Sequence, residues 1–370
     1  KGSLVVTTPK LTTDDYDSLP EGMGQDIAHY NTYNHRRRFF ENPKDPENKG
    51  LKAYLREDGR IPCGINNFST ATGRSSHSVW VNVAGDGSLY GEESRKTIIS
   101  PEGRILVGAD MKSAQLSIAG YYACNEDYYK ACAEGLEFDE NGIYLGKSAH
   151  CINARAFTLV SEAEYKKALE TQDKELIHSI SLRRKASKGG SFATIFGASG
   201  KKVATTLGIP EELGTQKKNA FLSNIGLDNV ISILERMTDK YSRAGGGYIE
   251  LPFGYYVWCK QKHKLFNYLD QGTEAVCQKW AVNYFTSEVE RLGLDAIKIL
   301  DTHDEYLVET TEDLADEVGK LMCKSYEEAS YAVWEWHKKN SKWFVGEALP
   351  KFCFNLDGGY SKAKNYYEVH

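Results

Sequence analysis

Two apolar segments that are far apart in the chain each lead directly into acidic residues. In "RILVGADMKSAQLSIAG" (104–120), Ile105, Leu106 and Val107 are typical of a short buried strand, and Asp110 follows the small residues 108–109. A carboxylate at the end of a buried strand is costly to desolvate unless something pairs with it. The position of Asp110 therefore predicts a partner elsewhere in the sequence.

The second segment is "DAIKILDTHDEYLVET" (295–310), in which apolar residues flank the polar "DTHDE". This pattern predicts a β-hairpin with a charged tip. If Asp304 of this tip lay beside Asp110, the pair would suit hard cations such as Mg²⁺, which proteins hold through carboxylates and substrate phosphates. A solvated hairpin tip is the simpler interpretation, and a metal phosphohydrolase would need further His and Asp ligands that have no obvious place. Neither tip decides the matter alone.

Composition sets broad limits. The chain has 370 residues, 41% hydrophobic and 26% charged, which is ordinary for a soluble globular protein with two or more subdomains. No apolar run approaches the ~20 residues of a membrane span. The eight cysteines include no Cys-x-x-Cys pair, which disfavours a zinc site or disulfide framework and favours a reducing environment. No secretory signal is visible, and a start at Lys1 is compatible with a fragment of a longer protein.

The sequence between the two acidic segments is mostly helical in pattern and contains a basic stripe. The net charge of −5 argues weakly against nucleic acid as a partner, but the basic residues are clustered. Four residues recur at intervals of four and so lie along one helix stripe: Arg184, Lys188, Phe192 and Phe196. Two cations followed by two aromatic rings can hold a triphosphate and pack against its sugar and base. A plain amphipathic helix is the alternative, and the small residues 189–191 favour an exposed stripe.

These segments occur in an order that resembles the family A DNA polymerases. "DMKSAQLSIA" resembles the family's first palm motif, "RKASKGGSFATIFG" its fingers motif and "THDEYLVE" its third motif. Further similarity is carried by "TATGRSSH" (70–77), "SAHCINARAF" (148–157), "NYLDQGTEA" (267–275) and the terminal "NYYEVH". The resemblance covers about residues 54 to 370. "QLSIA" and His263, four residues before Asn267, favour the phage and mitochondrial branch.

The resemblance implies an α+β, right-hand polymerase fold with an antiparallel palm sheet, a helical fingers insertion and a partial thumb. The expected division is a partial thumb or connector at 1–60, palm at 61–124, fingers at 125–250 and palm again at 251–370. The implied activity is template-directed DNA synthesis, in which deoxynucleotides are added to a primer 3′ end and pyrophosphate is released. The implied cofactor is Mg²⁺, as two ions ~3.5–4 Å apart that stabilise the attacking and leaving oxygens.

The resemblance also assigns residues to the chemistry. Asp110 and Asp304 would bind the two Mg²⁺ ions, with the Met111 carbonyl as a further ligand. Glu305 and His303 would support the primer 3′ end. The residues that grip the incoming triphosphate would be Arg184, Lys188 and His150, and Lys188 would donate a proton to the leaving pyrophosphate.

Further implied contacts concern the nucleotide and the duplex. Phe192 would pack on the nucleotide sugar and Phe196 would stack near the templating base. The residues placed at the duplex, mostly at the minor-groove edge near the primer terminus, would be Arg74, Asn267, Gln271, His303 and His263. Minor-groove acceptors are nearly independent of sequence, so such contacts would test the shape of the base pair.

Two positions depart from the family pattern. Gln115 stands where the family has a glutamate that blocks the ribose 2′-OH, and Phe196 replaces the usual tyrosine. Since glutamine has almost the same volume, we expect deoxynucleotides to remain preferred with altered stringency.

Two other classes of protein remain open on the sequence alone. A single-subunit RNA polymerase shares the palm and fingers, but its third motif typically reads His-Asp-Ser, whereas this chain has Glu305. An inactive primer–template binding module is the other alternative. The expected partners are primer–template DNA and deoxynucleoside triphosphates, with room for a separate exonuclease, processivity factor or helicase and no membrane. The expected location is intracellular, in a bacterial host's cytoplasm if phage-encoded or in an organelle.

Overall fold

The computed structural model describes residue 16 and residues 19–45, 50–80, 83–85, 87–239, 246–340, 344–346 and 348–369. Its central element is a four-stranded sheet with the order β6-β7-β3-β8, in which every neighbouring pair is antiparallel. The strands are β3 (Arg104–Met111), β6 (Ala296–Thr302), β7 (Glu305–Thr311) and β8 (Gly358–Ala363). The two predicted acidic segments therefore pair in one sheet, with Val107 opposite Val308.

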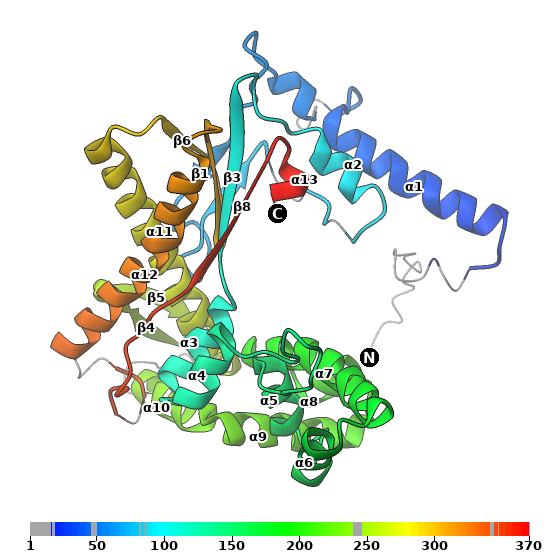
Figure 1. Cartoon of the computed structure of the whole chain (residues 1–370), viewed down its shortest axis with the longest axis vertical. Coiled ribbons are helices and arrows are strands. Elements are labelled where there is room, and N and C mark those ends of the chain that lie inside the picture. The colour runs from blue at the N-terminus through cyan, green and yellow to red at the C-terminus, as the bar shows by residue number, and fades with distance from the viewer. Residues whose placement is uncertain are drawn as a thin grey trace, which may run out of the picture.

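Both faces of this sheet are covered (Figure 1). On one face α11 (Leu265–Leu292) packs against α12 (Ala315–Lys339), which contacts β3, β7 and β8. Side chains alternate across the sheet, so Val107 and Tyr306 belong to the large core under these helices, while Leu106 and Leu307 belong to a smaller core on the other face. This two-sided burial explains why β3 reads as a continuous apolar run.

The smaller core is closed by the C-terminal helix α13 (Tyr366–Val369), which packs against α2 (Gly91–Lys96) and the sheet. Gly108 allows this close approach, because a Cβ added there would clash with Cγ1 of Val369. The terminal His of "NYYEVH" lies outside the described residues.

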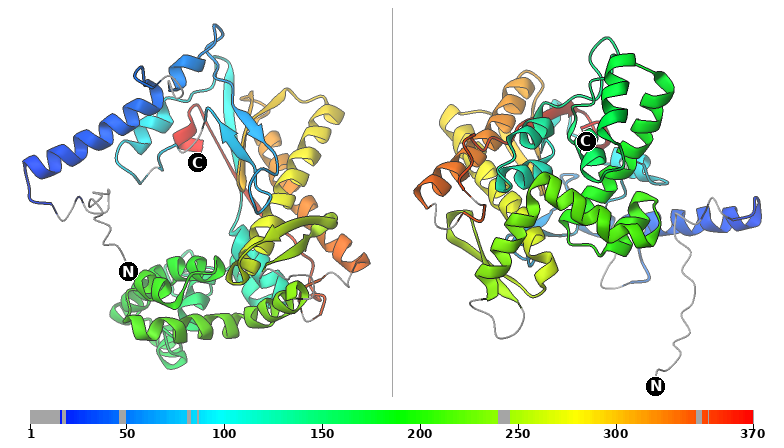
Figure 2. Two further views of the ribbon diagram at one scale, coloured as in Figure 1. Left: turned by 180° about the vertical axis from the view of Figure 1, so that it is seen from behind. Right: turned by 90° about the horizontal axis from the view of Figure 1, so that it is seen from below.

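The segment after β3 forms the predicted helical insertion, drawn green in Figure 1 and seen from two further sides in Figure 2. It follows α3 (Ala114–Tyr122), begins with α4 (Glu126–Ala133) and has α7 as its longest helix. Its helices are α5 (Ala149–Ala156), α6 (Glu162–Thr171), α7 (Lys174–Ile195), α8 (Gly200–Leu207), α9 (Gly214–Ile225) and α10 (Leu227–Asp239). The chain then returns through the hairpin of β4 (Gly247–Leu251) and β5 (Tyr255–Cys259) to α11.

The helices α6 and α7 are separated by only two residues, Gln172 and Asp173. Gln172 adopts a left-handed backbone with φ of 51°, which ends α6. The side chain of Asp173 then accepts hydrogen bonds from the backbone N–H groups of Glu175 and Leu176 and caps α7. The N-terminal part contains α1 (Met23–Phe40), which covers the basic stretch 28–40, and the short strands β1 (Gly64–Asn66) and β2 (Ser76–Ser78). The predicted α+β fold with an antiparallel sheet and a helical insertion is confirmed.

Candidate active site

The two residues that are predicted to bind metal ions lie close together at one end of the sheet. Asp110 is the penultimate residue of β3 and stands opposite Glu305 in the register of β3 and β7. Asp304 lies in the turn between β6 and β7, and its carbonyl oxygen accepts a hydrogen bond from the Met111 N–H at 3.0 Å. The antiparallel register thus brings together two acids that the sequence separates widely.

The turn that carries Asp304 has only two residues, His303 and Asp304, between paired Thr302 and Glu305. His303 has φ of 54°, the left-handed conformation that tight two-residue hairpins need at their first position. Its imidazole and the Asp304 side chain are thereby kept at the tip of the hairpin. Asp110 and His303 are exposed, Asp304 is partly exposed and Glu305 is buried.

Two buried side chains, from α12 and α11, form hydrogen bonds with the ends of β3, β6 and β7. Tyr326 of α12 donates its hydroxyl to the carbonyl of Ala109 at 2.8 Å and lies 3.2 Å from the carbonyl of Asp304. Burial and the nearby carboxylates raise the pKa of Tyr326 well above its usual value, so the hydroxyl remains a donor. From α11, Gln278 donates to the Glu305 carbonyl at 3.1 Å and to Oδ1 of Asp301 at 3.2 Å. These bonds fix the backbone around Asp110 and Asp304.

A second cluster adjoins the carboxylates and contains Gln115, Arg74 and Glu274. Gln115 is in the first turn of α3, and its side chain favours the charged form of the buried Glu274 carboxyl of α11. Nη2 of Arg74 contacts both carboxyl oxygens of Glu274, at 2.6 and 2.7 Å. Burial raises the pKa of Glu274 to about 7 against the opposing effect of Arg74, and the charge of Asp304 adds to the rise. Two predicted substrate contacts, Gln115 and Arg74, thus meet on an acid that the sequence analysis did not select.

The remaining predicted duplex contacts line the start of α11 and the hairpin tip. Asn267 and Gln271 lie one turn apart on α11 and are partly exposed, and Oδ1 of Asn267 is buried without a hydrogen-bond partner in the described part of the chain. Although His303 is exposed at the tip, partial desolvation of its ring and then the positive charge of Arg74 lower its pKa. His263 precedes α11 in a short 3₁₀ turn, and its carbonyl faces Gly197 at the end of α7.

The four residues of the predicted stripe lie along one side of α7. Lys188 is exposed and Arg184 is partly exposed, whereas Phe192 and Phe196 are partly exposed and pack against the large core. The rings of Phe192 and Phe196 have centroids 6.0 Å apart. His150 of α5 lies beside the cations, since burial and then the charges of Lys188 and Arg184 lower its pKa to about 4. Arg184 also forms an ion pair with Glu137, in which its Nη2 lies 2.6 Å from Oε2 of the glutamate.

The small residues Gly190 and Ser191 of α7 serve helix packing, which is not the role expected from the sequence. Gly190 and Ser191 are buried, and a Cβ added to Gly190 would clash with Cδ2 of Leu207 on α8. They allow α8 to pack closely against the back of α7. Gly190 and Ser191 therefore do not expose the stripe as expected, and of the three small residues only Gly189 is exposed.

The sequence analysis missed four residues that shape this site: Glu137, Glu274, Gln278 and Tyr326. For Glu274, Gln278 and Tyr326 the available signal was the placement of polar residues inside apolar runs of long helices, as in "QGTEAVCQKWAV" of α11, whereas Glu137 lies in the loop between α4 and α5. Such residues are expensive to bury unless they are paired, which marks them as candidates. Their partners, however, come from distant segments.

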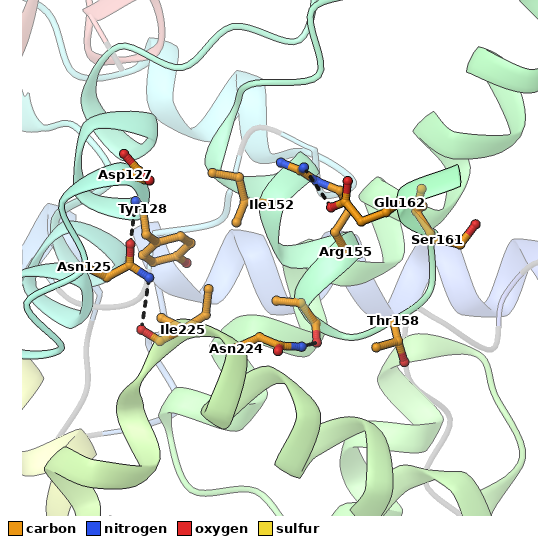
Figure 3. Close-up of a pocket in the computed structure, with 12 residues that line it drawn as sticks. Asn125, Asp127, Tyr128, Ile152, Arg155, Thr158, Ser161, Glu162, Asn224 and Ile225 are labelled. Atoms are coloured by element: carbon orange, nitrogen blue, oxygen red, sulfur yellow. Dashed lines mark hydrogen bonds and ion pairs between the residues drawn. The ribbon is translucent and has the colours of Figure 1, made fainter. Parts of the chain in front are cut away.

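A surface hollow of the helical insertion lies apart from these residues (Figure 3). Its walls include Asn125, Arg155 and Asn224, and no predicted site residue lines it. Asn125 donates to the Ile225 carbonyl at 3.1 Å, and Asn224 donates to that of Ala156 at 2.9 Å. These amides join α4, α5 and α9, so the hollow is a packing seam.

Among the described residues, no helix is long and apolar enough to cross a membrane, and no group of three or more His, Cys, Asp or Glu side chains is arranged to hold a metal ion. Any cation at Asp110 and Asp304 would therefore need further ligands from the backbone, water or substrate.

Known proteins resemble this chain in sequence and in fold. It is 25% identical over 354 residues to a DNA-directed DNA polymerase of Escherichia phage Phieco32, covering 80% of this chain and 56% of that protein. It is 24% identical over 280 residues to the thermostable DNA polymerase I of Thermus aquaticus, covering 71% and 29%. The chain thus spans about half or less of these relatives.

Among solved structures, the POL domain of Pol1 from M. smegmatis, in complex with DNA primer-template and dNTP, superimposes with a TM-score of 0.62 at 18% identity. The match covers 86% of this chain and 50% of that one, and it supports the right-hand polymerase fold. The model of DNA polymerase family A matches residues 47–335, well over half of the 370 residues. The chain belongs to DNA polymerase family A.

Proposed function

We propose that this chain is a template-directed DNA polymerase that adds deoxynucleotides to a primer 3′ end and releases pyrophosphate. The observation that carries the proposal is the meeting of Asp110 and Asp304 at one sheet end, in a chain whose helical insertion carries two cations and two aromatic rings at four-residue spacing. Family membership supports it, as do the DNA primer-template and dNTP bound to the similar POL domain of Pol1 from M. smegmatis. In this proposal 1–60 is a partial thumb or connector, the palm is formed by 61–124 and 251–370, with the sheet, α11 and α12, and the fingers are formed by 125–250, with α4–α10.

The oxygen donors at the sheet end fit divalent cations. Asp110 and Asp304 present carboxylates, and the Met111 backbone lies between them. All are hard oxygen ligands, and Mg²⁺ commonly completes its coordination with water and substrate phosphate. Bound there, two Mg²⁺ ions would stabilise the attacking primer oxygen and the leaving oxygen.

The protein's own residues would mainly position the reactants. Arg184, Lys188 and His150 would bind the triphosphate, and the exposed Lys188 would supply a proton to the departing pyrophosphate. Phe192 would contact the nucleotide sugar and Phe196 the templating base. Because phosphoryl transfer leaves the protein chiefly electrostatics and positioning, this set of groups suffices for the reaction class.

Contacts with the duplex would come from the palm. Asn267 and Gln271 would face the minor groove near the primer terminus, with Arg74 and His263 beside them. Glu305 and His303 would support the primer end from the hairpin.

The test is primer extension with Mg²⁺ and each nucleotide type. We expect the wild type to extend with deoxynucleotides, and Asp304→Asn to lose at least about a thousandfold in rate while it still binds the duplex. Equal extension with ribonucleotides would favour the RNA polymerase alternative. Duplex binding without any extension by the wild type would favour an inactive binding module.

A further inference from the structure

Lys112 lies directly after β3, two residues beyond Asp110, and forms an exposed ion pair with Asp357. Its Nζ lies 2.6 Å from Oδ2 of Asp357, and 47% of the lysine side chain and 40% of the aspartate side chain are exposed. The backbone of Lys112 continues the pairing of β3 with β8, because its N–H donates to the Asp357 carbonyl at 2.9 Å. Backbone and side chain therefore both fix the lysine to the segment that begins β8.

Lys112 and Asp110 share one face of the sheet. Side chains two residues apart along a strand point to the same face, and the paired backbone extends this alternation to Lys112. Gly359 is opposite Asp110 in the register of β3 and β8. A Cβ on this glycine would lie 3.6 Å from Oδ1 of Asp110 and 3.5 Å from Cε of Lys112. The carboxylate and the lysine thus border the same glycine, and no side chain of residue 359 separates them.

The order of the strands separates Lys112 from the groups expected at the primer. Because β3 lies between β7 and β8, the β6–β7 hairpin is on one side of Asp110 and Lys112 is on the other. The hairpin carries His303 and Glu305, which would support the primer 3′ end. In phosphoryl transfer the leaving oxygen lies in line with the attacking oxygen, on the opposite side of the phosphorus. With the primer on the β7 side, the leaving pyrophosphate is expected on the β8 side, beside Lys112.

The charges at this end of the sheet favour a phosphate group as the ligand of Lys112. The sheet end carries the carboxylates of Asp110 and Asp304, whereas the groups assigned above to the triphosphate all belong to the helical insertion. A lysine ammonium has three donors and is a common partner of phosphate. Its ion pair with Asp357 is exposed, and such pairs typically contribute less than about 1 kcal/mol. A phosphate oxygen can therefore replace the carboxylate at little cost.

We propose that Lys112 is a substrate-binding residue that holds the β- and γ-phosphates of the incoming nucleotide and then the pyrophosphate. The proposal rests on the proposed polymerase function. Without substrate, Asp357 keeps the lysine at the sheet end, and in the complex Lys112 exchanges this carboxylate for a phosphate oxygen. The triphosphate is then held from the palm as well as from α7. A phosphate of the primer strand offers the same chemistry, and the test separates the two sources.

The test measures binding without turnover, on a complex with a 3′-dideoxy-terminated primer–template in the presence of Mg²⁺. The probes are dATP, followed by fluorescence, and inorganic pyrophosphate as its competitor. We expect Lys112→Gln to raise both Kd values about tenfold, the effect of one charge-assisted hydrogen bond. Lys112→Arg keeps a cation and should stay within about threefold of the wild type. The Kd of the primer–template itself should change by less than about twofold, because no contact with its backbone is lost.

Two further variants test the exchange and its specificity. Asp357→Asn releases Lys112 from the ion pair and should lower the Kd for dATP about twofold to threefold. Lys362→Gln is the matched control, because Lys362 of β8 forms a similar exposed ion pair with Asp316, at 2.8 Å. Lys362 lies farther along the sheet, opposite Val107. We expect this control to leave all three Kd values within about twofold of the wild type.

The outcomes separate this inference from the polymerase proposal. Unchanged Kd values for dATP and pyrophosphate in folded Lys112→Gln overturn the role of Lys112 and leave the polymerase activity standing. Weaker binding of the primer–template with unchanged dATP binding assigns the lysine to a primer-strand phosphate and overturns the nucleotide assignment. A wild type that binds dATP but does not extend a free primer contradicts the activity, and a loss of dATP affinity in Lys112→Gln would then still support the inference.

Discussion

The hydroxyl of Tyr326 provides a direct test of how the fold positions the two carboxylates. Tyr326→Phe removes a hydrogen bond of 2.8 Å to Ala109 and a longer contact to Asp304, and it leaves the ring in place. Losing a buried hydrogen bond and leaving a carbonyl without that partner costs about 1–2 kcal/mol. We expect the free energy of unfolding in urea to fall by that amount.

Activity should fall by more than stability explains. The Ala109 and Asp304 carbonyls lie next to or within the residues that would bind the metal ions, and small displacements of reacting groups are costly in rate. We expect kcat for primer extension to fall about tenfold, which corresponds to about 1.4 kcal/mol of transition-state stabilisation, with little change in duplex affinity.

Tyr306→Phe is the matched control. Tyr306 is equally buried, but its hydroxyl bonds Ser325 Oγ at 2.9 Å and lies 3.4 Å from the Met322 carbonyl. The control removes the same group from the same core without touching the carbonyls at the strand ends. We expect it to lose about 1 kcal/mol of stability and to keep kcat within about twofold. If the two variants lose kcat equally, or if Tyr326→Phe keeps full kcat, the reasoning is refuted.

Three further predictions concern other contacts. Glu137→Gln removes a negative charge 2.6 Å from Arg184 but keeps a hydrogen-bond acceptor, so the KM for deoxynucleotides should fall severalfold in steady-state extension; a raised KM would contradict this. His337 is buried with its pKa lowered to about 4, so its neutral form stabilises the fold above the unfolded pKa of about 6.5, and this contribution is lost as the pH falls towards 4. In urea unfolding at pH 7 and pH 5, His337→Asn should lose about 2 kcal/mol less than the wild type on acidification, and equal losses would argue against it. Gly197→Ala would press a Cβ against the His263 carbonyl at a φ of 78°, so we expect a lower midpoint of thermal unfolding, whereas an unchanged midpoint would disagree with this packing.

The sequence by itself determined the elements that carry the chemistry. The apolar runs and their polar flanks predicted β3 and the β6–β7 hairpin, because a strand buried on both faces needs an apolar side chain at nearly every position. The four-residue spacing predicted the stripe on α7, because helix geometry alone places those residues on one side. The ordered motifs predicted the family, which is confirmed. The placement in the phage and mitochondrial branch and the roles of the site residues stay predictions.

Only the tertiary structure decided how these elements meet. The register of β3 on β7 sets Asp110 opposite Glu305, and a register is a property of two strands that neither strand's sequence contains. The pairing of Glu274 with Arg74 likewise joins two segments that are far apart in sequence. Burial strengthens the electrostatic effect of these contacts, because the charge state of a carboxyl removed from water depends on the few groups that surround it.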